Sequence, residues 1–417
     1  MSVPNTTTFT FQDVTTEVYS DINVGRNLVS AFVDATGTFD PSYVGSKNQL
    51  LNFRNYCQLS IIRVLLISAG YANTEVIDSN NLTWGWGYNY QGQIGDNSTT
   101  DKCIPVSILG TKKTFCKISA GGEYLTVLDK NGQVWGWGYN NTGQLGINSL
   151  ITKYTPVSIL GTKKTFCEIE SSWNSTLSID NRGLVWGWGY NYQGVIGDNT
   201  NIERLTPVSI LGAKKTFCKI AGGQYHTIAL DKNSQVWGWG YNYYGQLGDN
   251  TVINRCTPVS ILGTKKTFCN VSAGGSYTIG LDKNGQVWEW GNNYYGQLGD
   301  NSIINRCTPV SILGIKKTFC KITAGTYQAL GIDNIGQVWG WGYNNYGQLG
   351  DNSTINRCTP VSILGIKKTF CNISAGGSHT IGIDKNGQVW GWGYNQHGQL
   401  GNGTTNFATT PIKVSFI

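Results

Sequence analysis

Apolar and polar residues alternate over short stretches along most of this chain, and glycine and asparagine bound these stretches. In residues 388–393, valine and glycine alternate strictly with two tryptophans, which places the two kinds on opposite sides of a strand. Residues 370–374 and 379–383 are rich in β-branched side chains and flank an Ala-Gly-Gly turn, and an Asp-Lys-Asn-Gly turn leads into residue 388. With a fourth stretch at residues 360–364, the pattern predicts units of four short antiparallel strands.

This unit repeats with a constant step of 51 residues. Four short strands per unit, seven units and a period near 50 residues predict an all-β fold, a seven-bladed β-propeller of 51-residue repeats over residues 57–417, with a linear solenoid as the alternative. Every unit is complete, as a closed ring requires. The marker of the unit is a pair of tryptophans, found at Trp84/Trp86, Trp135/Trp137, Trp186/Trp188, Trp237/Trp239, Trp288/Trp290, Trp339/Trp341 and Trp390/Trp392.

Composition narrows the class of protein further. The chain has 55 Gly and 15 Trp but only 13% charged residues, which excludes a disordered chain and a helical bundle. Fourteen of the tryptophans belong to the pairs and only Trp173 lies outside them. We expect the paired tryptophans to pack between blades against bare glycine faces. Aromatic richness is therefore mainly a property of the fold.

Several motifs carry a family resemblance. Residues 341–350 read Trp-Gly-Tyr-Asn-Asn-Tyr-Gly-Gln-Leu-Gly, residues 375–380 contain Ala-Gly-Gly before His-Thr, and residues 383–390 read Ile-Asp-Lys-Asn-Gly-Gln-Val-Trp. Together they resemble the repeat of the regulator of chromosome condensation family, which implies a propeller. Nucleotide-exchange members of that family act through a wedge-like protrusion, for which the uniform step leaves no room. The family's recurrent histidine appears only as His226 and His379, which we interpret as a structural hydrogen-bonding position.

Reactive residues occur in repeated columns rather than as one asymmetric set. An aspartate recurs at a single turn position in all seven units, from Asp78 to Asp384, where it would cap the turn backbone. The three histidines are dispersed and no Cys-x-x-Cys pair occurs, so we predict no metal site, no cofactor and no enzyme activity. We expect a cysteine column at the start of one strand to be buried as small apolar residues: Cys116, Cys167, Cys218, Cys269, Cys320 and Cys371.

Cations form two further columns, for which two interpretations stand. One column consists of lysine pairs before each Thr-Phe-Cys, and the other runs from Lys102 and Lys153 to Arg204, Arg255, Arg306 and Arg357. They could attract an anionic surface, or they could be solvated turn residues that keep the fold soluble. The net charge of +7 is moderate, so nucleic-acid binding is not predicted.

A variable loop before Gly-Gln-Leu-Gly is the leading candidate for a binding surface. Its composition of Tyr, Asn and Gln is typical of binding surfaces and suits stacking on sugar rings, although ordinary variation of turn residues would give the same pattern. Trp173 stands where most copies have a small residue, and it would be either an exposed anchor or a space-filling residue. The predicted ligand-binding residues are Tyr192, Tyr243, Tyr244, Tyr294, Tyr295, Tyr346, His397 and Trp173.

Residues 1–56 do not belong to the repeat. They would form a short, partly helical segment, with a helix at residues 12–35, that is too small to bury a substantial core. Its end, Gly-Ser-Lys-x-x-Leu-Leu-Asn-Phe-Arg-Asn-Tyr, resembles a leader module at the start of bacteriophage structural proteins, which implies attachment to other virion proteins and homo-oligomeric assembly. The residues that would anchor it are Leu50, Leu51, Phe53, Arg54 and Tyr56.

These observations predict a non-enzymatic binding protein. The expected role is a propeller displayed by an N-terminal anchor on a virion, in its head or tail, made in the host cytoplasm and contacting a host surface glycan or protein. No secretory signal or span long enough for membrane insertion is visible in the sequence. The alternative is a cytoplasmic propeller scaffold associated with chromatin or a small GTPase.

Overall fold

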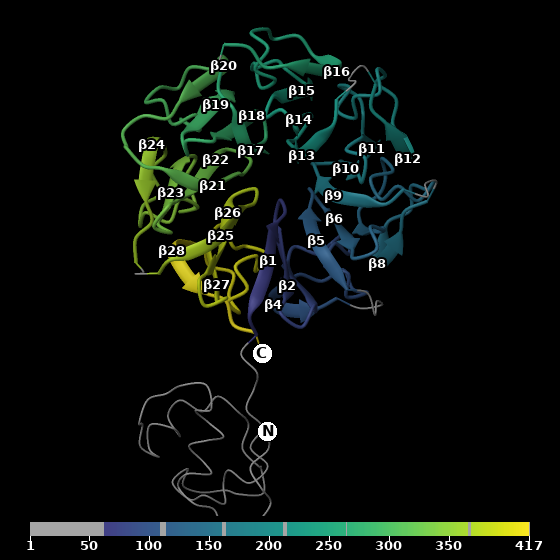
Figure 1. The fold of residues 1–417 in the computed structure, drawn as a ribbon. Helices are drawn as coiled ribbons and strands as arrows, with labels where there is room; N and C mark the ends of the chain where they lie inside the picture. Colours follow the sequence, from purple (N-terminus) through teal and green to yellow (C-terminus); the bar gives the residue numbers. More distant parts are fainter. Residues whose placement is uncertain are drawn as a thin grey trace, which may run out of the picture. The chain divides into compact units, whose positions relative to one another are not determined.

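The protein forms a ring of seven β-sheets, as the computed structural model of residues 62–108, 114–160, 164–211, 215–263, 265–365 and 368–416 describes it (Figure 1). This part of the chain contains strands and no helix. The predicted seven-bladed propeller is therefore confirmed. The chain divides into two compact units, Met1–Ile62 and Arg63–Ile417. The predicted helix at residues 12–35 and the five anchoring residues lie outside the described residues.

Each blade is one contiguous segment of four strands. Blades 1 and 2 contain β1 (Val64–Ala69), β2 (Asn73–Asp78), β3 (Thr83–Gly87), β4 (Lys102–Ser107), β5 (Phe115–Ala120), β6 (Tyr124–Asp129), β7 (Val134–Gly138) and β8 (Lys153–Ser158). Blades 3 and 4 contain β9 (Phe166–Ser171), β10 (Ser175–Asp180), β11 (Val185–Gly189), β12 (Arg204–Ser209), β13 (Phe217–Gly222), β14 (His226–Asp231), β15 (Val236–Gly240) and β16 (Arg255–Ser260). Blades 5 to 7 contain β17 (Phe268–Ala273), β18 (Tyr277–Asp282), β19 (Val287–Gly291), β20 (Arg306–Ser311), β21 (Phe319–Ala324), β22 (Gln328–Asp333), β23 (Val338–Gly342), β24 (Arg357–Ser362), β25 (Phe370–Ala375), β26 (His379–Asp384), β27 (Val389–Gly393) and β28 (Ala408–Lys413).

The strands of each blade pair in chain order, with the first strand nearest the axis (Figure 1). The innermost strands neighbour one another around the axis, and β1 lies against β25 and β26, which closes the ring without a shared sheet. Because neighbouring strands are antiparallel, the connections from first to second and from third to fourth strands lie on one face of the ring. We call this the loop face, and the opposite one the turn face.

The two tryptophans of each pair have different environments. Trp137 is fully buried, and its ring lies against Gly95 of the preceding blade, where a Cβ atom would lie 2.6 Å from the indole nitrogen. Its Nε1 donates to the carbonyl of Gln93 at 2.9 Å. Trp135 is only partly buried and donates to the Asp129 carboxylate at 3.2 Å. The first member of the pair is thus less buried than the second, but it still packs between blades: Trp135 lies against a core cluster that includes Ile77 of the preceding blade.

The glycine between the paired tryptophans differs from the prediction. A Cβ on Gly136 would lie 3.1 Å from Leu145, which belongs to the same blade. That glycine therefore makes room for a leucine of its own loop, while the last glycine of the Gly-Gln-Leu-Gly motif receives the ring of the next blade.

The aspartate column caps the turns as predicted. Asp384, for example, accepts the N–H groups of Asn386 and Gln388 at 2.9 and 3.1 Å and the indole N–H of Trp390 at 3.2 Å. A lysine of the preceding turn lies over the same ring, with the Lys368 ammonium 5.9 Å from its centre. Lysine, tryptophan and aspartate form this arrangement on the turn face in blades 3 to 7.

The cysteine column does not have the predicted burial. Cys116, Cys167, Cys218, Cys269, Cys320 and Cys371 are exposed free thiols. The cause is an irregularity in the strand: the pairing register shifts between Phe115 and Lys117, so Cys116 bulges out of the alternation. A second cysteine column, which precedes the Pro-Val strand, is partly buried and packs against glycine: a Cβ on Gly194 would lie 2.7 Å from the backbone of Cys256. Its members are Cys103, Cys256, Cys307 and Cys358.

Candidate binding face

Two buried side chains, an asparagine and a glutamine, hold the variable loop in shape in every blade except blade 3, where Val195 replaces the glutamine. In blade 4, Asn242 accepts the N–H of Leu247 at 2.9 Å and donates to the Asp249 carboxylate at 3.0 Å and to the carbonyl of Ile253 at 3.1 Å. Gln246 accepts the N–H of Tyr244 at 3.0 Å. Both amides are fully buried. The variable side chains therefore project from a frame that the fold itself fixes.

The loop tyrosines of blade 4 belong to one ring cluster. The rings of Tyr243 and Tyr244 are 5.0 Å apart in an edge-to-face arrangement, and both contact Tyr241. Tyr241 contacts Tyr225 of the neighbouring hairpin, which reaches Tyr190 of blade 3 at 5.7 Å. Tyr243 nonetheless keeps 65% of its surface exposed. Such clusters offer apolar area with little loss of side-chain entropy on binding.

A longer chain of rings crosses blades 5, 6, 7 and 1. Tyr295 contacts Tyr294, Tyr327 and Tyr343 at 4.9, 5.2 and 4.8 Å. Tyr346 then links Tyr343 at 6.3 Å to Tyr394 at 4.7 Å. His397 contacts Tyr394 and, across the closure of the ring, Tyr88. We call both clusters together the tyrosine belt: Tyr88, Tyr190, Tyr225, Tyr241, Tyr243, Tyr244, Tyr294, Tyr295, Tyr327, Tyr343, Tyr346, Tyr394 and His397.

The belt gathers six of the eight predicted ligand-binding residues. Tyr192 is the exception within the loops: it is 70% exposed and makes no ring contact within the described part of the chain. Trp173 lies outside the belt in the axial pocket described below. Sequence reasoning missed the tyrosine that follows the second Trp-Gly in six of the seven blades, where blade 5 has Asn292, and the hairpin residues Tyr225 and Tyr327. The signal that could have found the hairpin pair is variation at this position of the repeat, which reads Ala72, Glu123, Asn174, Tyr225, Ser276, Tyr327 and Ser378.

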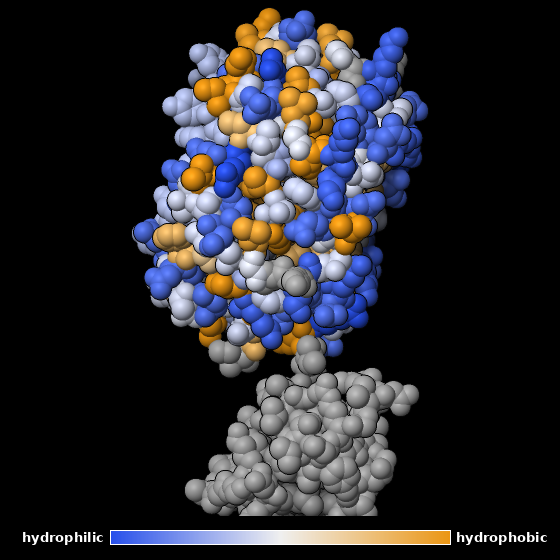
Figure 2. Space-filling model, turned by 90° about the vertical axis from the view of Figure 1, so that its left-hand side faces the viewer, coloured by the Kyte–Doolittle hydropathy of each residue, from blue (hydrophilic) through white to orange (hydrophobic). Residues whose placement is uncertain are grey.

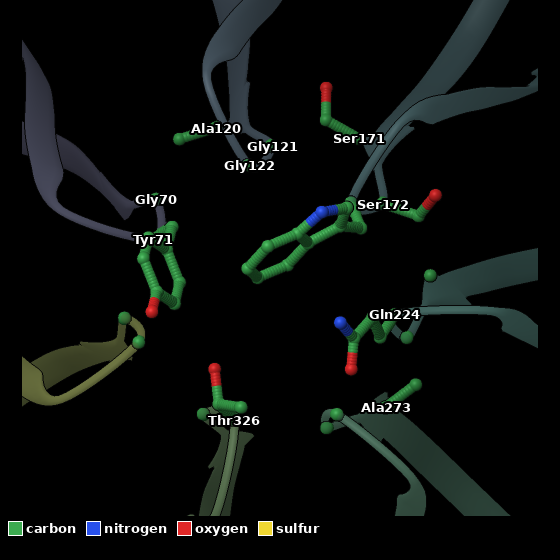
Figure 3. A pocket seen from close by; sticks show the side chains of 18 of the residues that line it. Gly70, Tyr71, Ala120, Gly121, Gly122, Ser171, Ser172, Gln224, Ala273 and Thr326 are labelled. Atoms are coloured by element: carbon green, nitrogen blue, oxygen red, sulfur yellow. The ribbon is translucent and has the colours of Figure 1, made fainter. Parts of the chain in front are cut away.

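An axial pocket opens on the loop face at the centre of the ring. All seven blades line it through the hairpins between their first and second strands, and it encloses about 450 Å³, including the part open to solvent. Most of its lining is Gly and Ala. Tyr71, Gln224 and Thr326 extend into the opening from different sides (Figure 3). Tyr71 meets Trp173 edge to face, with ring centres 4.7 Å apart.

The belt and the pocket belong to one surface. Burial raises the pKa of Tyr327, and the neighbouring phenols of Tyr295, Tyr71 and Tyr244 raise it further. Thr326 of the pocket lining directly precedes Tyr327, whose ring contacts Tyr295 of the belt at 5.2 Å. The raised pKa keeps the Tyr327 phenol protonated at neutral pH, so its hydroxyl can both donate and accept hydrogen bonds.

Beneath the pocket, in blades 2, 4, 5, 6 and 7, one buried side chain of each blade bridges to the next blade. Tyr277 donates to the carbonyl of Gln328, and Gln328 donates to the carbonyl of Gly376 at 3.0 Å. His226 and His379 occupy the same position and bond the hydroxyls of Thr278 and Thr74 at 3.1 and 3.0 Å. The interpretation of these histidines as structural hydrogen-bonding residues is thus confirmed.

The cation columns have partners within the protein. Arg204 and Arg357 donate from Nε to Asp198 and Asp351 at 2.7 and 2.8 Å. Partial burial raises the pKa of Asp198, but hydrogen bonds from Thr200 and Arg204 outweigh it and lower the pKa overall. These pairs weaken the case for an anionic-surface site and favour the structural interpretation. On the side shown in Figure 2, apolar residues are dispersed among polar ones.

Other kinds of site find no support in the described residues. No three His, Cys, Asp or Glu side chains converge there to hold a metal ion. In the same part of the chain, no helix is long and apolar enough to cross a membrane.

Known proteins share this architecture. The chain is 26% identical to the ultraviolet-B receptor UVR8 of Arabidopsis thaliana over 348 residues, 82% of this chain and 79% of that protein. The crystal structure of human WBSCR16 matches with a TM-score of 0.73 at 20% identity, covering 80% of this chain and 94% of the other. That of Prp20p from Saccharomyces cerevisiae, described with its binding to Gsp1p and histones, matches at 0.72 and 19%, covering 86% and 87%. At these identities the two structures show the fold alone.

Family models decide the membership. The model described as RCC1-like domain matches residues 37–320. The regulator of chromosome condensation (RCC1) repeat model matches residues 336–383 and 386–417. The sequence resemblance is confirmed by these matches and by the seven blades, and the chain belongs to the RCC1-like domain family.

Proposed function

We propose that this protein is a non-enzymatic binding protein that recognises a partner through the tyrosine belt on its loop face. The observation that carries the proposal is the contrast between a fixed frame and variable exposed rings. Asn242 and Gln246 hold the loop, while Tyr243 and Tyr294 expose 65% and 69% of their surfaces. Relatives of the family include a receptor and a protein that binds Gsp1p and histones, which supports a binding role.

The belt is testable by removing four of its rings together. Substitution of Tyr243, Tyr244, Tyr294 and Tyr295 by Ser removes aromatic area at two clusters, so binding to printed glycans or intact bacterial cells should weaken by about 30-fold, the effect of a loss of about 2 kcal/mol. Tyr192→Ser is the matched control, because that tyrosine is equally exposed and lies outside the belt. Unchanged binding by the fourfold variant would exclude the belt as the recognition surface.

The finer hypothesis places this propeller on a virion through residues 1–56. It rests on the resemblance of the leader segment, since those residues lie outside the described ones. Immunogold labelling of purified phage particles, with and without residues 1–56, tests it: the full chain should label particles and the truncated chain should not. Association with chromatin or a small GTPase is the competing role, and tight, salt-sensitive DNA binding would favour it.

A further inference from the structure

The axial pocket differs from the rest of the repeat at one blade. Trp173 of blade 3 occupies the position that is glycine in blades 2, 5 and 7, and Ser172 replaces the glycine before it. Ser172 donates to the carbonyl of Ser175 at 2.9 Å, and the carbonyl of Trp173 accepts the N–H of Gly122 at 3.1 Å. These bonds hold the hairpin that carries the tryptophan. The pocket is therefore an asymmetric feature within a nearly sevenfold ring.

The side chains that line the pocket are uncharged. Ala, Gly, Ser, Gln, Thr, Tyr and Trp make up its lining, with no acidic or basic side chain among them. Lysines on neighbouring strands are already engaged: Lys117 pairs with Glu168, and Lys219 donates to Asn270 at 3.0 Å. A charged ligand would therefore lose hydration without gaining an opposite charge. The pocket favours a neutral ligand.

Two aromatic rings and two polar side chains set the shape of that ligand. Tyr71 and Trp173 meet edge to face, which leaves a flat apolar ring surface next to a phenolic hydroxyl. Gln224 and Thr326 enter from other blades and supply both donors and acceptors (Figure 3). A pyranose combines an apolar C–H face with a rim of hydroxyls, so it can stack on the ring and bond the amide and hydroxyl together.

The backbone around the opening is already organised for binding. The N–H of Tyr71 donates to the carbonyl of Gly121 at 3.2 Å, and that of Thr326 to the carbonyl of Gly376 at 3.4 Å. A Cβ on Gly377 would lie 2.5 Å from the carbonyl oxygen of Tyr71, so the close contact between these hairpins requires glycine. Because these contacts already hold the hairpins in place, the pocket needs little ordering when a ligand enters.

We infer that the axial pocket binds one neutral pyranose unit, stacked on Trp173 and Tyr71, while the tyrosine belt contacts the rest of the glycan. This inference deepens the proposed function and rests on it. The ligand of the axial pocket is a neutral, hydroxyl-rich sugar rather than an acidic one. Trp173 and Tyr71 supply stacking area, and Gln224 and Thr326 select hydroxyl orientation.

Indole resonances of the full chain, labelled with ¹⁵N-tryptophan, provide the test. The probes are the methyl pyranosides of glucose, galactose, mannose and N-acetylglucosamine. At least one should shift the Trp173 indole signal saturably, with a Kd on the order of 1 mM, as expected for a ligand of this size. That signal is identified by its loss in Trp173→Gly, a substitution already present in three blades. Gln224→Ala should weaken the same binding about tenfold, as loss of one hydrogen bond does.

Each result decides between the pocket and the belt. If none of the four probes moves the Trp173 signal, the pocket inference is wrong, even where the belt variants still lose binding to glycans or cells. If a sugar shifts only other signals, the pocket inference is equally wrong and the belt remains the site. If an acidic sugar, glucuronic acid, binds as well as the neutral probes, the assignment to neutral sugars fails. If neither the belt variants nor the pocket variants lose binding to cells, the proposed function itself is overturned.

Discussion

At the scale of single residues, Glu289 is a buried departure from the repeat. It stands where the other six copies have glycine, and its side chain is fully buried. The indole N–H of Trp341 donates to its two carboxyl oxygens at 3.0 and 3.2 Å, whereas Trp137 and Trp188 donate to a backbone carbonyl. Burial raises the pKa of Glu289 well above its usual value, although the bond from Trp341 opposes the shift. The folded protein therefore keeps this carboxyl protonated over a wide pH range.

The substitution Glu289→Gln tests this proton directly. In the unfolded chain the carboxyl ionises above about pH 4.3, while the folded state keeps the proton up to its raised pKa. Between these values the free energy of unfolding falls as pH rises, by up to about 1.4 kcal/mol per pH unit. Gln keeps an oxygen for Trp341 but cannot ionise, so the variant should lose this slope and be more stable at pH 7.

Urea unfolding of both proteins from pH 5 to pH 8 measures the slopes. Glu75 is a second fully buried carboxyl whose pKa burial also raises well above its usual value, so Glu75→Gln should flatten a further part of the slope. Identical pH dependence of the wild type and Glu289→Gln would show that Glu289 is already ionised in the folded protein.

At the scale of the element, the aspartate-capped turn connects each second strand to the third. Asp333 is fully buried and accepts three hydrogen bonds, from the N–H groups of Ile335 and Gln337 at 3.1 and 2.9 Å and from Trp339 at 3.1 Å. One side chain thus fixes both the turn and the partly buried tryptophan of the next strand. This explains why the aspartate recurs in all seven blades of a protein with few charged residues.

Asp333→Ala should therefore destabilise the protein strongly. It leaves three donors without their acceptor, so we expect a loss of about 3 kcal/mol in the free energy of unfolding. Asp333→Asn should cost less, since its oxygen can still accept the turn N–H groups. The midpoint of urea unfolding measures both. Asn334→Ala, an exposed change in the same turn, is the control and should lie within about 0.5 kcal/mol of the wild type. An equal effect of all three would contradict the capping role.

Sequence periodicity predicted the elements well because each strand and turn is encoded locally. The alternation around Trp390 and Trp392 predicted strand β27, and the Asp-Lys-Asn-Gly turn predicted where that strand begins. Periodicity failed where a strand breaks its own alternation: the bulge at Cys116 turns the thiol outward, which no pattern of residue types indicates. It also treated both tryptophans of a pair alike, because their burial depends on the neighbouring blade.

The site was predictable in part for the same reason. The variable loop stood out against an invariant frame, so Tyr244 and Tyr295 were found from the sequence. The contact between Tyr71 and Trp173 could not be found in this way, because it joins residues about a hundred positions apart whose side chains do not recur in other blades. Its partners Gln224 and Thr326 became visible only when the ring brought seven hairpins together.

At the scale of the whole molecule, closure of the ring depends on non-covalent contacts between blades 7 and 1. His379 bonds Thr74 at 3.0 Å, Trp86 donates to the carbonyl of Gln399 at 2.9 Å, and Gly403 donates to the carbonyl of Cys103 at 2.8 Å. The bond between His226 and Thr278 at 3.1 Å repeats the first of these contacts between blades 4 and 5. The closing interface therefore resembles an internal one, without a shared sheet to reinforce it.

Acid should weaken this closure through His379. Burial lowers its pKa to about 3, while the unfolded chain takes up the proton near pH 6.5. The contribution of His379 is therefore fully present above about pH 6.5, and it is lost as pH falls towards 3, by up to about 1.4 kcal/mol per pH unit. Gln328 fills the same position in blade 6 without titrating, so His379→Gln should resist acid unfolding better than the wild type.

Unfolding by urea between pH 4 and pH 7 measures the acid sensitivity, and hydrogen exchange at β1 and β26 shows where the ring opens. His226→Gln is the matched variant, since burial lowers the pKa of His226 to about 3 as well but within an internal interface. Both substitutions should reduce the fall in the free energy of unfolding as the pH is lowered. Only His379→Gln, however, should slow hydrogen exchange at β1 in acid. If the two variants protect β1 equally, the ring does not open first between blades 7 and 1, and its closing interface is as strong as the others.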